Sequence, residues 1–139
     1  MADFFAVRDS IKAQIEGEIS EIRKVYFAED AAGIKEQSQI TPAAHILYSG
    51  YNPAQAERHR VDITLDQTWT VVLVLRQAQG KYDGGEILDK LVQVLHGYQP
   101  DAAVMKLELA NAPFSPSYTP RAAYYPLAFT TRVINRKGA

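Results

Sequence analysis

The residues of this chain best suited to acid–base or metal chemistry are its three histidines, His45, His59 and His96. None of them stands in a metal-binding spacing such as HExxH, so the sequence predicts no metal site. His59 precedes Asp62 by three residues at the start of an expected strand. Because residues i and i+3 of a strand point to opposite faces, these two side chains are poorly placed to form a catalytic pair.

The acidic residues near the middle of the chain are better explained by structure than by catalysis. Asp83, Glu86 and Asp89 gather where a helix is expected to begin, and helix capping and a solvated face account for them. The chain has no cysteine and no serine in a GxSxG context, and its glycines do not form GxxxxGK[ST]. The sequence therefore predicts no catalytic residue and no cofactor.

Composition and charge indicate an ordinary globular chain. It has 139 residues, 47% hydrophobic and 22% charged, which suits one domain with its own core. The formal net charge of -1 gives no general attraction to nucleic acid or to an anionic membrane. The longest aliphatic run covers only residues 71–75, and the N-terminus lacks the pattern of a signal peptide. We expect a cytoplasmic protein with no membrane contact and no specific nucleic-acid contact.

Residues 61–100 form the expected core unit. Apolar residues occupy every second position over 61–75, with Gln67 as the single break, which predicts strand structure. After a loop over 77–85, apolar residues recur with helical spacing over 87–95, and Gly97 and Pro100 are expected to end that helix.

The length of this strand pattern leaves three arrangements open. One straight strand over 61–76 would span roughly 50 Å, more than the roughly 30–40 Å diameter of a compact domain of this size. The segment could bend near 66–68, form a hairpin there, or project in part as an arm. We favour two pairing strands with a turn or bulge around Asp66 and Gln67.

The rest of the chain predicts an α+β fold, a single domain over 1–139 with a mostly antiparallel sheet packed by two main helices. A first helix is expected from Asp3 to about Gly17. Pro42 suits an edge or a bulge of the second strand. The other expected elements are strands at 22–27, 40–48, 103–109 and 124–133, a loop at 29–39 and a turn at 49–53.

The segment 110–123 is unusually long for a loop without its own structure. It contains three prolines together with Phe114 and Tyr118, and it leads into Tyr124. Long loops in compact domains usually bind something or stay disordered. The aromatic residues indicate either a surface for a partner or a loop that folds back on the domain's own core.

Four segments, taken in order, resemble the tail terminator (tail completion) proteins of Mu-like bacteriophages and prophages. They are AHILYSGY at 44–51, WTVVLVLR at 69–76, GEILDKLVQVLHGY at 85–98 and YYPLAFTTR at 124–132. The order of elements is also similar: an N-terminal helix, a strand ending in Ser-Gly-Tyr, a Trp-led strand ending in Arg, a helix, and a late aromatic strand. The resemblance covers most of the chain.

The resemblance implies a non-enzymatic component of the virion tail that assembles in the cytoplasm of the bacterial host. Such proteins form a ring, usually a hexamer, that ends polymerisation of the tail tube and offers a surface to the head completion or connector protein. The implied partners are therefore other copies of the chain, the tail tube protein and the head connector. The candidate interface residues are Arg76, Tyr82, Phe114, Tyr118, Arg121 and Arg132.

Two alternatives remain from the sequence. A small enzyme or ligand-binding domain would use a site between sheet and helix, with His45, His59 or Asp62 converging in a pocket. Another head–tail connector or adaptor protein could share the same general fold.

Overall fold

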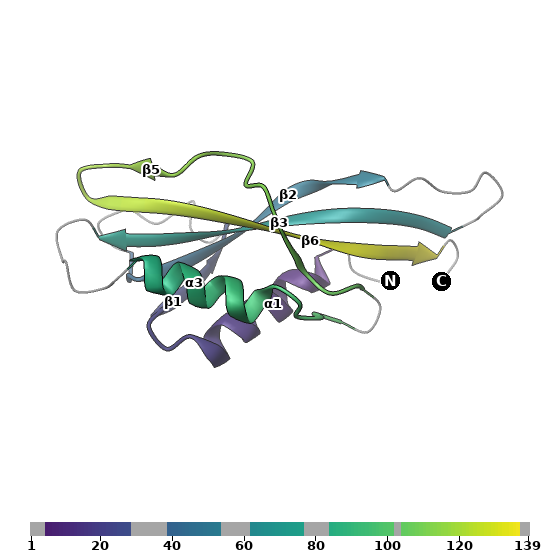
Figure 1. The fold of residues 1–139 in the computed structure, drawn as a ribbon, viewed down its shortest axis with the longest axis horizontal. Coiled ribbons are helices and arrows are strands. Elements are labelled where there is room, and N and C mark those ends of the chain that lie inside the picture. The colour runs from purple at the N-terminus through teal and green to yellow at the C-terminus, as the bar shows by residue number, and fades with distance from the viewer. Residues whose placement is uncertain (1–4, 29–38, 54–61, 77–83, 102–103, 137–139) are drawn as a thin grey trace.

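A computed structural model of the chain describes residues 5–28, 39–53, 62–76, 84–101 and 104–136 (Figure 1). The described helices are α1 (Ala6–Glu18) and α3 (Gly84–Leu95). The described strands are β1 (Lys24–Phe27), β2 (Ala43–Pro53), β3 (Asp62–Arg76), β4 (Glu108–Ala110), β5 (Ser117–Tyr118) and β6 (Ala122–Arg136). The predicted α+β class is confirmed.

The strands form one mostly antiparallel sheet in the order β1-β2-β3-β6-β4, with β5 also paired to β6. Only β1 and β2 are parallel among the described pairs. β4 and β5 follow each other along the outer edge of β6, beside Ala128–Thr130 and Ala123–Tyr124 respectively. Helices α1 and α3 cover one face of this sheet (Figure 1).

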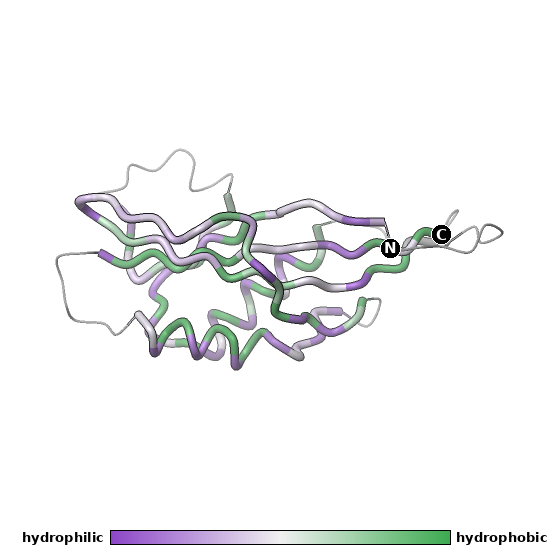
Figure 2. The backbone as a smooth tube through the Cα atoms, turned by 45° about the horizontal axis from the view of Figure 1, so that its top comes forward, coloured by the Kyte–Doolittle hydropathy of each residue, from purple (hydrophilic) through white to green (hydrophobic). Residues whose placement is uncertain are grey.

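The core lies between the two helices and the sheet. Both helices show alternating hydrophobic and hydrophilic stretches along the tube in Figure 2, as the periodicity predicted. Their buried residues pack against one face of β3, where the odd-numbered residues lie. The main buried residues are Val7, Ile11 and Ile15 of α1, Ile87, Leu91 and Leu95 of α3, and Trp69, Val71 and Leu73 of β3. A smaller cluster with Val72 and Val74 lies on the opposite face.

The favoured hairpin around Gln67 is wrong, because β3 is one unbroken strand of 15 residues. It pairs with β6 along its whole length, from Asp62 opposite Arg136 to Arg76 opposite Ala122. Gln67 interrupts the apolar pattern without a turn, since its Oε1 accepts a hydrogen bond from the buried Trp69 Nε1 at 3.2 Å. The strand reaches beyond the helices, so the projecting arm is the arrangement observed (Figure 1).

The predicted turn at 49–53 is also wrong. β2 continues to Pro53, and its pairing with β3 shifts in register between Tyr48 and Tyr51, where the turn-forming residues lie. Gly50 sits there with a φ of 98°, a conformation that glycine adopts without the steric cost of a Cβ. Pro42 precedes β2, and β2 is an inner strand between β1 and β3, not an edge.

The expected strand at 103–109 is formed only in part. β4 covers Glu108–Ala110, and an isolated bridge joins Val104 to Val133. Between them Leu107 bonds to the end of α3 instead, because its N–H donates to the Tyr98 carbonyl and its carbonyl accepts from the Gly97 N–H. Ala103, residues 29–38 of the expected loop and residues 77–83 lie outside the described residues.

The segment 110–123 and the last strand also differ from expectation. The segment begins with the last residue of β4, contains the two-residue β5 and ends with the start of β6. β6 therefore begins two residues earlier and ends three residues later than the strand predicted at 124–133.

Candidate interaction surfaces

The predicted interface residues do not form one surface. Tyr118 in β5 lies opposite Ala123, near the start of β6, whereas Arg132 lies nine residues further along that strand. At about 3.3 Å per residue these positions are roughly 30 Å apart. Arg76 ends β3 and Arg121 immediately precedes β6, so both lie at the Tyr118 end of the sheet. Tyr82 lies outside the described residues.

Phe114 and Tyr118 are two exposed aromatic residues of the segment 110–123, and we call them the edge aromatics. Their exposed fractions are 47% and 62%. The Tyr118 ring lies edge-on to Tyr125 with 5.8 Å between the ring centroids, and burial raises the pKa of Tyr125 above its ordinary value. The folding-back alternative is therefore wrong for these two aromatics, since neither enters the core.

A further exposed surface is the arm, which comprises residues 51–53 of β2, 62–66 of β3 and 132–136 of β6. The three strands pair side by side in the arm, because Pro53 of β2 lies opposite Leu65 of β3, and Leu65 lies opposite Val133 of β6. Its large exposed apolar residues are Tyr51 at 54%, Ile63 at 52% and Ile134 at 41%. The exposed residues of this surface are not indicated by the sequence, because the expected turn at 49–53 and the favoured turn or bulge around Gln67 fall within the strands that build the arm.

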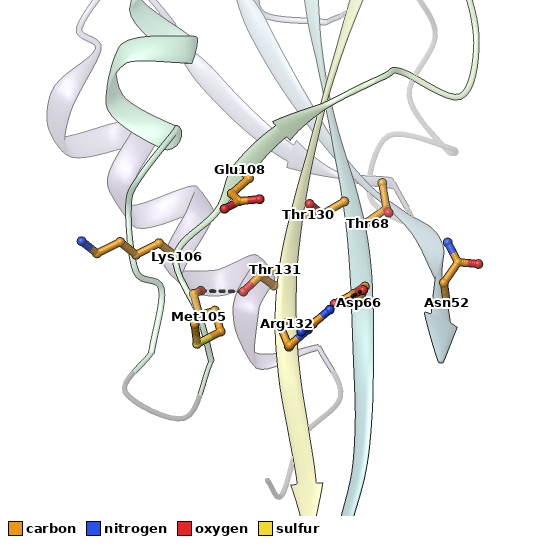
Figure 3. A pocket seen from close by; sticks show the side chains of 9 residues that line it. All are labelled: Asn52, Asp66, Thr68, Met105, Lys106, Glu108, Thr130, Thr131 and Arg132. Carbon is orange, nitrogen blue, oxygen red and sulfur yellow. Dashed lines mark hydrogen bonds and ion pairs between the residues drawn. The ribbon is translucent and has the colours of Figure 1, made fainter. Parts of the chain in front are cut away.

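A groove lies at the base of the arm, with a cavity volume of about 420 Å³ (Figure 3). Asp66 and Arg132 line it and face each other across β3 and β6. The Arg132 Nε and Nη2 donate to the two carboxylate oxygens of Asp66 at 2.9 and 3.2 Å. This hydrogen bonding raises the pKa of Arg132 further above its ordinary value. The remaining lining residues are Asn52, Thr68, Met105, Lys106, Glu108, Thr130 and Thr131.

The groove opens on the sheet face away from the helices. Asp66 and Thr68 are even-numbered residues of β3, whereas the residues that contact the helices are odd-numbered. Thr131 is buried, and its hydroxyl donates to the Met105 carbonyl at 2.6 Å, which fixes the wall of the groove. Met105 itself is 58% exposed on the rim.

A smaller pocket of about 210 Å³ involves another candidate, Arg76. Arg23, Gln39, Ile40 and Thr41 complete its lining. The Arg23 Nη1 donates to the Thr41 carbonyl at 3.4 Å, so one guanidinium is held at the pocket by backbone. The two ionisable residues that line this pocket, Arg23 and Arg76, both carry a positive charge.

Among the described residues, His45, His96 and Asp62 lie at separate places in the fold. His45 lies opposite Val72 in β2, ten residues along β3 from Asp62. Its Nε2 bonds the Gln39 Oε1 at 3.2 Å, and burial lowers its pKa. The His96 Nδ1 accepts a hydrogen bond from the Leu109 N–H, and His59 lies outside the described residues. The described residues thus give no support to a pocket built on His45 and Asp62.

The described residues show neither a metal-binding cluster nor a membrane-spanning helix. No group of three or more His, Asp or Glu side chains is placed to hold a metal ion in the part of the chain that the structure describes. None of the described helices is long and apolar enough to cross a membrane.

The family of the chain follows from its sequence profile. The profile of the phage tail terminator protein family matches residues 1–138. The chain belongs to this family. A tail terminator is a structural protein of the phage tail, so the exposed surfaces described above belong to a virion tail component. The resemblance seen in the four sequence segments is confirmed at the level of the phage tail terminator family.

Solved structures agree with the fold of this tail terminator. One solved protein, whose name states no function, matches with a TM-score of 0.52 and 15% identity. The match covers 91% of this chain and 94% of that chain. At this identity it supports the fold alone. No curated protein sequence matches the chain.

Proposed function

We propose that this tail terminator forms a closed hexameric ring at the head-proximal end of the tail tube. The ring ends tube polymerisation and presents the surface to which the head completion or connector protein attaches. The chain does this without catalysis or a cofactor, and it assembles in the cytoplasm of the bacterial host. The observation that supports this best is the family match over residues 1–138.

The two exposed surfaces suit such a role physically. A ring uses heterologous contacts, so each copy must present two different patches whose rotation closes the assembly. The edge aromatics and the arm are different in composition and lie at opposite ends of β6. Arg76 and Arg121 lie near the edge aromatics, and we assign them to contacts with the tube or the connector.

A tail-length assay tests the function directly. Inactivating the gene in the phage that encodes it is expected to give overlong tubes without heads, and a plasmid copy is expected to restore tails of normal length. Electron microscopy of purified particles measures both results. The matched control is His45→Gln, which should restore tail length fully, because His45 has no part in assembly under this proposal. Tails of normal length in the absence of the gene would contradict the proposed function.

A further inference from the structure

Two residues of the mostly polar groove at the base of the arm, Arg132 and Met105, have side chains that can contact an aromatic ring. Arg132 bonds Asp66 through the edge of its planar guanidinium, in a fork of 2.9 and 3.2 Å. Such edge-on bonding leaves the flat faces of the guanidinium available for stacking, and its side chain is 53% exposed. Met105 on the rim adds a thioether, which also contacts aromatic rings favourably.

Tyr118 of the same copy cannot reach this groove. Tyr118 is fixed opposite Ala123 by the pairing of β5 with β6, and Arg132 lies nine residues away along β6. That distance is about 30 Å along a strand, several times the length of a tyrosine side chain. Phe114 lies between Ala110 and Ser117, which are held opposite Ala128 and Tyr124. Those two β6 residues are four and eight positions from Arg132, roughly 13 and 26 Å along the strand, and the segment with Phe114 runs between them.

We propose that the edge aromatics of one copy, Phe114 and Tyr118, seat against Arg132 and Met105 in the arm groove of a second copy. The inference rests on the proposed function, because it names the contact between neighbouring copies of the ring. An arm-to-arm contact would leave the edge aromatics exposed in every copy. A head-to-tail contact covers both surfaces in every copy with one kind of interface.

The absence of cysteine allows a direct test by disulfide trapping. Met105→Cys and Tyr118→Cys are made in separate chains, mixed in equal amounts and exposed to a mild oxidant. The expected product is a mixed disulfide dimer, with each single variant alone giving little homodimer. A chain carrying both substitutions is expected to give a covalent ladder that ends at the number of subunits in the ring. Ile40→Cys, at another exposed apolar residue, controls for random collision.

The outcomes separate the possible contacts. Homodimers of Met105→Cys or of Tyr118→Cys would indicate a symmetric contact and overturn the inference. Mixed disulfides no more abundant than those with Ile40→Cys would also overturn it. Either result leaves the tail-length assay unaffected, so failure of this contact and failure of the proposed function can be told apart.

Substitution of Arg132 tests the stacking contact itself. Arg132→Lys keeps the positive charge beside Asp66 but removes the planar face, and we expect self-association to weaken roughly three- to tenfold. Tyr118→Phe keeps the ring and should associate like the wild type, whereas Tyr118→Ala should weaken association. Sedimentation at several concentrations measures these constants. Unchanged association of both Arg132→Lys and Tyr118→Ala would refute the contact.

Discussion

The buried pair of Gln67 and Trp69 makes the sharpest prediction about stability. Both side chains are essentially inaccessible, at 0% and 1% exposure, and the Trp69 Nε1 donates to the Gln67 Oε1 at 3.2 Å. Gln67→Leu removes the acceptor while filling most of its volume. A buried donor left without a partner costs about 1–3 kcal/mol. We therefore expect Gln67→Leu to lower the free energy of unfolding by about that amount.

A double-mutant cycle isolates the hydrogen bond from the other effects of the change. Trp69→Phe removes the indole N–H, so Gln67→Leu should cost at least about 1 kcal/mol less in that background. Gln67 makes a further interaction, whose loss is common to both backgrounds and cancels in the cycle. Urea unfolding followed by circular dichroism measures all four proteins, and fluorescence of the only tryptophan checks the wild type and Gln67→Leu. Equal costs in the two backgrounds would refute the reasoning.

Two further predictions concern pH and backbone conformation. Burial lowers the pKa of His45 below its ordinary 6.5. On acidification the unfolded chain therefore protonates this histidine at a higher pH than the folded protein does, so stability should fall as the pH drops below about 6.5. His45→Gln should reduce the difference between urea midpoints at about pH 7.5 and about pH 5.5, and an unchanged difference would contradict the assignment. Gly97 has a φ of 84°, so Gly97→Ala should destabilise by about 1–2 kcal/mol. Gly17 lies inside α1 with open space at its Cβ position, so Gly17→Ala should raise the free energy of unfolding by about 0.5–1 kcal/mol. Thermal melts measure both glycine variants, and a melting temperature that shifts in the same direction for both would contradict this reasoning.

The sequence predicted those elements whose hydrophobic period is regular. Apolar residues of α3 recur at helical spacing, and the structure begins and ends this helix between Gly84 and Gly97, close to the expected limits. Strand structure in β3 and β6 was predicted for the same reason. The α+β class followed from the order of these elements, because a sheet and two helices with one apolar face each can bury them only against one another.

The arm is one of the three arrangements that the sequence leaves open, but it is not the favoured one because its strands contain local signals for turns. Ser49, Gly50 and Asn52 favour a turn by their own chemistry, but β2 carries them as a bulge while its pairing with β3 resumes at Tyr51. Gln67 interrupts the apolar pattern, which favours a turn, yet its Oε1 accepts a hydrogen bond from the Trp69 Nε1 within the strand. In both places pairing with neighbouring strands overrides the local preference. Among the residues proposed for contacts, Phe114, Tyr118 and Arg132 are candidates from the sequence, whereas Met105, Ile63 and Ile134 are candidates from the structure alone.

The arm also explains why one strand can serve both the fold and the proposed assembly. The half of β3 from Trp69 to Leu75 alternates between the helix-facing core and the second cluster, so it holds the domain together. The other half reads Asp62, Ile63, Thr64, Leu65 and Asp66, and Ile63 is half exposed although it lies on the helix-facing side. Its register is nevertheless fixed by β6, since Asp62–Arg76 pair without a shift. A groove built on such a strand keeps its geometry before any partner arrives, which lowers the entropy cost of docking a second copy.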